Sequence, residues 1–341
     1  MTTGAPSIGS DTSILHFLRP FDALIERDDI TEIAVNSPRE IWFESNSLWQ
    51  AIGDDAVSDR AIVELGGAVA TYSKQIWDAT KPLLSASMPD GSRMQFARSP
   101  AVESGRTSFT MRKPAKTTRS LDDFAAAGLF ESVQPMQLEL LAHEQQLKQL
   151  LAAKRYEEFF RQAVVHRLNI VVAGATGSGK TTFMKSLVTE IPKTERLITI
   201  EDVRELFVPH KNAVHLLYSK GGQSGSDVTP KSLLESCLRM KPDRILLAEV
   251  RGDECLYFVR NAASGHPGSM TSCHAGSPAL AMEQMAIMIQ DSPGGSNLTF
   301  DVIKRLLTLT IDVIVQFQNV DGRRFISEIY YAPEKKLEAS R

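Results

Sequence analysis

The second half of the chain alternates short apolar runs of strand length with longer segments whose apolar residues recur at helical spacing. The runs predicted as strands are 169–173, 196–200, 214–217, 244–250 and 312–318. The segments predicted as helices are 181–191, 230–240, 254–263, 278–290 and 300–309. This alternation is typical of βαβ units, in which helices cover both faces of a largely parallel sheet. Asp321-Gly322, between two strand-like runs, predicts a hairpin near the end of the chain.

The first third of the chain follows a different pattern, in which strand-like runs predominate. Residues 14–25 have near-helical apolar spacing, although Pro20 favours a break or a helix start, and 60–72 is a second helical segment. The strand-like runs are 32–36, 40–44, 93–98 and 107–112. We therefore predict a smaller N-terminal α+β domain over residues 14–113, preceded by a flexible tail of small and polar residues, 1–13.

The segment between these two parts contains few apolar side chains at its start. Lys113-Pro114 ends the last strand-like run, and 136–153 is rich in the good helix formers Leu, Ala, Glu and Gln. That helix either belongs to an interdomain linker, which we place at 114–153, or is an edge helix of the second domain. The second domain is predicted over 154–341 and is α/β with a mostly parallel sheet.

Length and composition favour a soluble protein of two domains. The 341 residues fit a rule of about one domain per 150 residues. Hydrophobic residues make up 43% and charged residues 23%, as in ordinary globular proteins. The net charge of −3 provides no basic excess, so we expect no sequence-specific binding of nucleic acid.

The remaining features favour a cytoplasmic protein. Cys237, Cys255 and Cys273 are odd in number and widely spaced, which suits a reducing compartment and no structural zinc site. The first residues do not form a secretory signal, and no apolar run approaches the roughly 18 residues that cross a bilayer. Any association with a membrane is therefore expected to be peripheral.

A P-loop of the Walker A type follows the first strand of the second domain, and a glycine-rich turn that merely precedes a lysine would lack this context. Glycines let successive N–H groups face phosphate oxygens, at the positive end of the next helix. Lys180 would reach the β- and γ-phosphates of ATP, and the Thr181 hydroxyl would complete the shell of Mg²⁺. The predicted ATP-binding residues are Gly174, Ala175, Thr176, Gly177, Ser178, Gly179, Lys180, Thr181 and Thr182.

Two further strand-like runs end in carboxylates. Glu249 follows an apolar run and resembles the end of a Walker B strand, with Glu where many families have Asp. It would hold Mg²⁺, through a water, or polarise the attacking water; the alternative is an exposed glutamate at a strand end. Glu201 and Asp202 end another run, and either would orient water or cap the next turn.

Residues 264–276 contain two histidines among small residues that permit close approach to phosphate. A histidine at a strand end, such as His274, can stabilise a γ-phosphoryl group. A metal site is the alternative. However, the eight-residue offset between His266 and His274 is not the spacing of a helical zinc pair, and Cys273 would point to the opposite face of a strand.

Taken in order, the segments 174–181, 196–202, 244–252 and 265–276 resemble the boxes of the secretion-superfamily ATPases. Within that superfamily, the chain most resembles the traffic ATPase of type IV secretion and conjugation systems, the eleventh component of the VirB series. The resemblance extends from about residue 14 to residue 331. Glu249 in place of the usual aspartate is also found in this family.

The resemblance implies a homohexameric ring of two-domain subunits, with a RecA-like P-loop domain and ATP bound between the domains. It also implies peripheral association with the cytoplasmic face of the inner membrane and contact with other secretion components. Arg93 and Arg112 match the N-terminal arginines that approach the phosphates in such rings, although by themselves they would be ordinary surface arginines. The segment 115–153 resembles a linker that lets the N-terminal domain pack over a neighbouring subunit.

Our leading hypothesis is therefore Mg²⁺-dependent ATP hydrolysis that drives substrate transfer or pilus assembly. A RecA-like nucleic-acid translocase is one alternative, but the chain lacks a basic stripe interleaved with aromatic residues. A nucleotide-dependent assembly switch is the other. A switch needs no hydrolytic groups, so the presence of Glu201, Glu249 and His274 argues against it.

Overall fold

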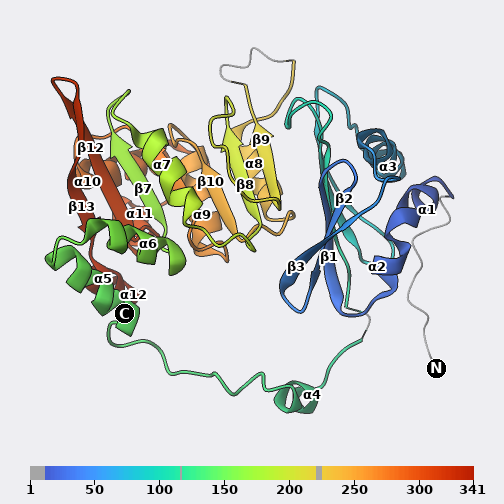
Figure 1. Cartoon of the computed structure of the whole chain (residues 1–341), viewed down its shortest axis with the longest axis horizontal. Coiled ribbons are helices and arrows are strands. Elements are labelled where there is room, and N and C mark those ends of the chain that lie inside the picture. Colours follow the sequence, from blue (N-terminus) through green and yellow to red (C-terminus); the bar gives the residue numbers. More distant parts are fainter. Residues whose placement is uncertain (1–11, 116, 220–224) are drawn as a thin grey trace.

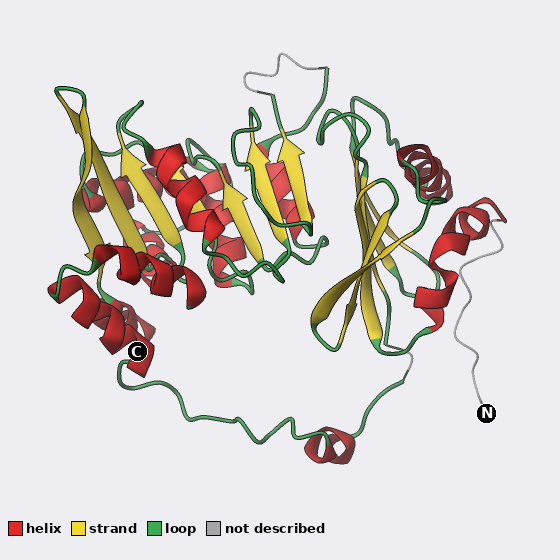
Figure 2. Ribbon diagram, viewed as in Figure 1, coloured by secondary structure: helices red, strands yellow, loops and turns green. Residues whose placement is uncertain are grey.

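The computed structural model describes residues 12–115, 117–219 and 225–341. Two β-sheets stand side by side, each with its own helices (Figures 1 and 2). One sheet is antiparallel and built from the first third of the chain, and the other is mostly parallel and built from the second half. The predicted α/β fold class is confirmed. Of the predicted tail, residues 1–11 lie outside the described residues, and Thr12 and Ser13 already belong to the first helix.

The first sheet has six antiparallel strands in the order β3-β2-β1-β6-β5-β4. Its strands are β1 (Ile30–Ser37), β2 (Glu40–Ser45), β3 (Leu48–Gly53), β4 (Leu83–Ser87), β5 (Arg93–Ala97) and β6 (Ser108–Arg112). Four of these were predicted, and β3 and β4 were not. The predicted N-terminal helix divides around Pro20 into α1 (Thr12–Leu18), a 3₁₀ turn η1 (Arg19–Phe21) and α2 (Asp22–Glu26). Helix α3 (Asp59–Tyr72) starts at Ser58, whose side chain accepts a hydrogen bond from Ala61 N–H.

The second sheet has seven strands in the order β13-β12-β7-β11-β10-β8-β9 and is parallel except for its terminal hairpin. Its strands are β7 (Ile170–Gly174), β8 (Leu197–Glu201), β9 (Ala213–Leu217), β10 (Arg244–Leu247), β11 (Met270–Cys273), β12 (Val313–Val320) and β13 (Arg323–Tyr331). The helices along this part are α6 (Tyr156–Val165), α7 (Lys180–Thr189), α8 (Pro230–Cys237), α9 (Glu254–Ala263), α10 (Pro278–Asp291), α11 (Phe300–Thr310) and α12 (Pro333–Ser340). The predicted hairpin at Asp321-Gly322 joins β12 to β13.

Alternate residues of the parallel strands enter two different cores, one on each face of the sheet. Val171 of β7 packs in the core formed with α8, α9, α10 and α11, whereas its neighbour Val172 packs with α6 and α7. Both side chains are fully buried. A parallel sheet buried on both faces needs continuous apolar strands, and this explains the strand-length apolar runs in the sequence.

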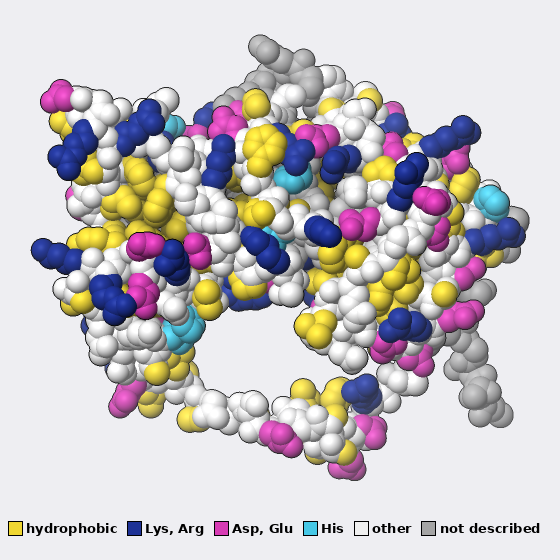
Figure 3. Space-filling view, viewed as in Figure 1, with side chains coloured by type: hydrophobic (Ala, Val, Ile, Leu, Met, Phe, Trp, Pro, Cys, Tyr) yellow, Lys and Arg dark blue, Asp and Glu magenta, His cyan; other side chains and the backbone are white. Residues whose placement is uncertain are grey.

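The connection between the sheets contains α4 (Leu121–Ala126) and α5 (Ala142–Ala152). Leu147 and Leu150 of α5 are buried in the same core as α6 and β7, so α5 packs as an edge helix of the second sheet. By contrast, Leu129, Phe130 and Val133 are 50–69% exposed. Figure 3 shows apolar side chains on the open surface of this stretch. The boundaries proposed for the two domains stay predictions.

The face of the first sheet that is turned away from its helices contacts the second part of the chain. Arg196, just before β8, is fully buried there and donates to the side chains of Asn36 and Asn212. At the end of β9, the backbone N–H of Leu217 donates to the carbonyl oxygen of Ala101 over 2.8 Å. None of the helices in the described parts of the chain has both the length and the apolar character needed to cross a bilayer.

Candidate active site

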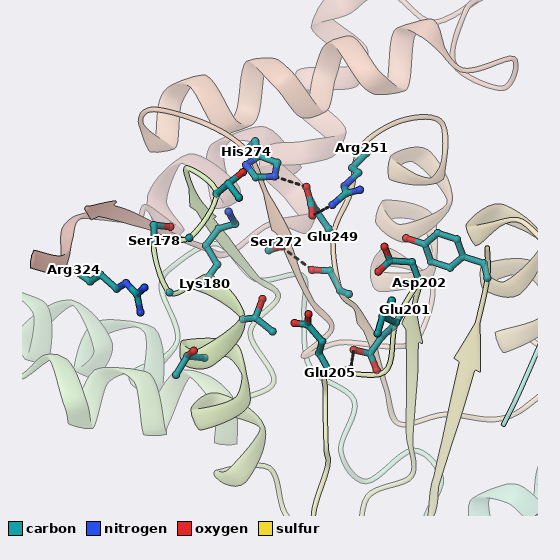
Figure 4. A pocket seen from close by; sticks show the side chains of 18 residues that line it. Ser178, Lys180, Glu201, Asp202, Glu205, Glu249, Arg251, Ser272, His274 and Arg324 are labelled. Carbon is teal, nitrogen blue, oxygen red and sulfur yellow. Dashed lines mark hydrogen bonds and ion pairs between the residues drawn. The ribbon is translucent and has the colours of Figure 1, made fainter. Parts of the chain in front are cut away.

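A cavity of about 560 Å³ opens where the parallel strands of the second sheet end. It is lined by Thr176 to Thr182, by Glu201 at the end of β8 and Asp202 after it, and by Glu249 and His274 after β10 and β11. The carboxyl ends of parallel strands meet at one edge of a sheet, so residues far apart in sequence converge there. The structure therefore brings together most of the predicted site residues (Figure 4).

The loop between β7 and α7 has a backbone that requires glycine. Gly174, Gly177 and Gly179 have φ angles of +151°, +73° and +103°, which side chains strongly disfavour. A Cβ on Gly174 would also lie 2.8 Å from the carbonyl oxygen of Phe317. The loop thus passes tightly beside β12 before α7 begins at Lys180.

Lys180 is held at the centre of this loop. Its Nζ donates to the carbonyl oxygens of Gly174 and Ala175 over 2.8 and 2.9 Å. Burial lowers the pKa of the ammonium group, while the charge of Glu249 acts in the opposite direction. The two hydrogen bonds therefore tie the Lys180 side chain to the backbone of its own loop, and the residue lines the cavity.

Glu249 lies between two basic side chains. Its Oε2 accepts a hydrogen bond from Arg251 over 2.6 Å, and its Oε1 lies 2.7 Å from Nε2 of His274. Figure 4 shows all three side chains on one side of Lys180. Because its side chain is only 16% exposed, Glu249 is not the solvent-exposed glutamate that the alternative interpretation described.

Glu201 is fully buried and has a structural contact. Its Oε1 accepts hydrogen bonds from the backbone N–H groups of Glu205 and Leu206, at 3.1 and 2.8 Å. Burial raises the pKa of this carboxyl. One oxygen of Glu201 therefore performs the turn-capping role that was the alternative to catalysis, although the residue also lines the cavity.

The two histidines of residues 264–276 have separate environments. His274 lines the cavity, whereas His266 Nδ1 lies 2.9 Å from the carbonyl oxygen of Pro242. Among the described residues there is no group of three or more His, Cys, Asp or Glu side chains suited to holding a metal ion. The structure thus does not bring the two histidines together as a metal site.

The predicted arginines of the first sheet lie outside the cavity of their own chain. Arg93 on β5 is directly opposite Arg112 on β6, and neither lines the cavity. Arg112 Nε is 3.6 Å from Oε1 of Glu32, and its side chain is 66% exposed. Their role at a phosphate group stays a prediction that concerns an assembled ring.

The cavity-lining residues that were not predicted include Arg251, Tyr218 and Arg324. Arg251 lies two residues after Glu249 and could have been found from that spacing. Tyr218 follows β9, and burial raises the pKa of its hydroxyl to about 12. Arg324 lies just after the predicted hairpin turn, but the sequence does not show that the hairpin flanks the P-loop.

Comparisons with known proteins agree with this geometry. A family model described as type II/IV secretion system protein matches residues 19–321. The type IV secretion system protein VirB11 of Brucella suis is 46% identical over 330 residues, covering 95% of this chain and 91% of the relative. VirB11 of Bartonella henselae is 41% identical over 334 residues, covering 95% of this chain and 94% of the relative.

A solved structure supports the same assignment. The crystal structure of the VirB11 ATPase from the Brucella suis type IV secretion system, in complex with sulphate, matches with a TM-score of 0.90. That match has 45% sequence identity and covers 96% of this chain and 99% of the other. The chain therefore belongs to the type II/IV secretion system protein family, within which it is a VirB11-like type IV secretion ATPase.

Proposed function

We propose that this chain hydrolyses ATP in a Mg²⁺-dependent reaction as a subunit of a homohexameric ring. The ring powers type IV secretion, conjugative substrate transfer or pilus assembly. The observation that carries this proposal is the convergence of Lys180, Glu249 and His274 on one cavity at the carboxyl edge of the parallel sheet. These are a phosphate-binding cation, a carboxylate and a group able to stabilise developing negative charge.

Binding of the triphosphate follows from the loop and the helix behind it. Backbone N–H groups of the P-loop and the N-terminal end of α7 favour an anion at this position. Lys180 is anchored to two carbonyl oxygens of the same loop, so its ammonium group is already held at the cavity wall.

The contacts of the two carboxylates support Glu249 as the group that orients the attacking water. One oxygen of Glu201 is occupied by two backbone N–H groups, and burial raises the pKa of that carboxyl. Glu249 instead reaches the cavity between Arg251 and His274, which contact its two carboxylate oxygens. An in-line water held by Glu249 would meet the γ-phosphate next to His274.

The residues at the cavity fit a magnesium ion that is bound largely by the nucleotide. Mg²⁺ prefers oxygen ligands and usually keeps several waters, so one or two protein oxygens suffice. Thr181 and Glu249 both line the cavity and supply such oxygens. When bound, the ion would neutralise charge on the β- and γ-phosphates. Glu249 would contact it directly or through a water.

Assembly into a ring is proposed to complete the site. Arg93 and Arg112 face each other across neighbouring strands, and like charges in that position repel. An anion brought close to both would relieve the repulsion, and the γ-phosphate held by another subunit is such an anion. In this arrangement hydrolysis would be coupled to movement of the N-terminal domain.

The cellular setting is inferred from the family. We propose a cytoplasmic protein that associates peripherally with the inner face of the inner membrane and contacts other secretion components. Support comes from the VirB11 relatives, which are named as type IV secretion system proteins. The overall charge of −3 favours no sequence-specific nucleic-acid partner.

Phosphate release from ATP, measured with and without Mg²⁺ beside the mass of the assembled particle, tests the proposal. Lys180→Ala should abolish phosphate release. Lys193→Ala should leave it intact, because Lys193 is exposed, follows the end of α7 and donates to the carbonyl oxygen of Thr189. Absence of both ATP binding and phosphate release in every assembled state would refute the proposal. Strong stimulation by single-stranded DNA with a steep salt dependence would favour a nucleic-acid translocase instead.

A further inference from the structure

Arg324 reaches the cavity from the side opposite the predicted catalytic groups. It lies on β13 in register with Asn319 of β12, and β12 pairs with β7. The strand order places β12 and β13 on one side of β7, and β11 and β10 on the other. Figure 4 accordingly shows Arg324 and Glu249 on opposite sides of Lys180.

The stem of Arg324 runs beside the P-loop. A Cβ on Gly179 would lie 3.6 Å from Cδ of Arg324, which is ordinary van der Waals contact. The side chain is exposed, and in the described parts of the chain no carboxylate lies within ion-pair distance of it. A guanidinium group with no carboxylate partner, positioned at the wall of an anion-binding cavity, is well placed to bind a ligand.

The positions of Lys180 and Glu249 fix the direction in which a nucleotide would lie. The γ-phosphate would lie beside the carboxylate and His274, because Glu249 is the group proposed to orient water and to supply an oxygen to a magnesium ion. The β-phosphate lies over the P-loop. A triphosphate is a chain, so its α-phosphate and nucleoside must leave toward the other end of the cavity. That end is the one that Arg324 lines.

We propose that Arg324 binds the α-phosphate of the nucleotide and thereby distinguishes the nucleoside end from the γ-phosphate end. This inference rests on the proposed ATPase function. The planar guanidinium donates two parallel hydrogen bonds to a phosphate, which gives both affinity and orientation. The stem of Arg324 lies within van der Waals distance of the Cβ position at Gly179, which places the side chain beside the P-loop.

The contact with the α-phosphate is present in ADP as well as in ATP. Arg324→Ala should therefore weaken the binding of ADP and of the non-hydrolysable analogue AMP-PNP by the same factor. We expect each Kd, measured by titration calorimetry, to rise about tenfold. Arg324→Lys keeps the positive charge but loses the two parallel N–H donors of the guanidinium. It should therefore cause an intermediate loss of affinity for both ligands. A residue at the γ-phosphate would instead affect AMP-PNP alone.

Arg323→Ala is the matched control. Arg323 precedes Arg324 on the same strand and does not line the cavity, and successive strand residues point to opposite faces. Its ADP and AMP-PNP affinities should equal those of the unaltered protein. The thermal midpoint of Arg324→Ala without nucleotide should also be unchanged, because the side chain is exposed and buries no core.

Two results would overturn the inference. Unchanged affinity of Arg324→Ala for both nucleotides would remove Arg324 from the binding site, and loss for AMP-PNP alone would place it at the γ-phosphate. Either result leaves the proposed function standing, provided that the unaltered protein binds ADP. If the unaltered protein binds neither nucleotide, the proposed function itself fails.

Discussion

Arg196 donates a 2.8 Å hydrogen bond from its guanidinium to Oδ1 of Asn36, and so joins the start of β8 to the first strand of the other sheet. The same guanidinium bonds Asn212 and the carbonyl oxygen of Met240, and it lies over the ring of Trp49. Arg196 is fully buried. A polar group sequestered in this way is stable only while its partners remain in place.

Arg196→Met should therefore lower the free energy of unfolding by about 3 kcal/mol, because Asn36, Asn212 and Met240 O lose a buried donor. Urea titration followed by circular dichroism would measure the change. Arg39→Met, at a side chain that is 76% exposed, should change stability by no more than about 0.5 kcal/mol. Equal stability of the two variants would contradict the assigned role of Arg196.

Glu32, near Arg196, should make stability depend on pH. Burial raises the pKa of its carboxyl to about 7, outweighing the charges of Lys241, Arg112 and Arg196. The folded chain then binds more protons at Glu32 than the unfolded chain does between pH 4.5 and 7. The free energy of unfolding should consequently fall as the pH rises through that window.

Glu32→Gln removes this titration while keeping the shape of the side chain. Relative to this variant, the unaltered protein should lose about 3 kcal/mol of stability between pH 4.5 and 7 and no more above it. Urea titrations of both proteins at a series of pH values measure the difference. Parallel curves across the window would show that Glu32 does not titrate as expected.

Two adjacent glycines of α3 should respond in opposite directions to alanine. A Cβ on Gly66 would lie 2.2 Å from the ring of Trp77, which is fixed by a hydrogen bond to Pro82 O, so Gly66→Ala should cost about 1–3 kcal/mol. A Cβ on Gly67 would meet nothing within 4 Å, so Gly67→Ala should stabilise the helix by about 0.5–1 kcal/mol. Thermal unfolding measures both, and a stabilising Gly66→Ala would disprove this packing.

Glu249→Gln should separate binding from hydrolysis. The amide keeps the size of the side chain but loses the charge that faces His274 and Arg251, so kcat should fall by about 10²–10³ while nucleotide still binds. Steady-state phosphate release and calorimetry measure the two quantities. Glu235→Gln on the exposed side of α8 is the matched control and should keep full turnover. Full turnover in Glu249→Gln would assign activation of water to another group.

Arg112→Ala should reduce turnover only where subunits are assembled. If Arg112 offsets charge at a phosphate held by another subunit, kcat of the assembled protein should drop by about 10³ with little change in nucleotide affinity. Arg60→Ala, at a side chain that is 87% exposed on α3, serves as the control and should behave as the unaltered protein does. An unchanged kcat for Arg112→Ala would exclude it from the site.

Local sequence predicted the P-loop because all its working parts are contiguous. The glycine spacing, the buried strand before it and the amphipathic helix after it together specify residues 174–182. Glu249 could be predicted because it follows a short apolar strand, and His274 because it lies in a stretch of small residues that permit close approach to phosphate. The carboxyl ends of parallel strands share one edge of a sheet, which brings the two side chains together. Strand β3 was missed since its residues are mostly exposed and form an edge, so no apolar alternation marks it.

Residues that depend on tertiary packing could not be predicted in this way. Arg196 precedes an apolar run and has the sequence pattern of a surface arginine, yet the first sheet covers it completely. The position of Arg324 could not be predicted either. Its strand β13 is the last strand of the chain, but in the sheet only β12 separates it from β7. Chain order does not encode strand order, and for that reason the hairpin was predicted but its position beside the nucleotide cavity was not.

The separation of Arg93 and Arg112 from the cavity has a consequence for how the cell conserves its energy supply. In the described residues of one chain, the cavity is lined only by residues of the second part of the chain, and these two arginines lie outside it. If they act only from a neighbour, a solitary copy would store ATP without consuming it. Subunits that are not yet incorporated into a secretion apparatus would then hydrolyse no ATP.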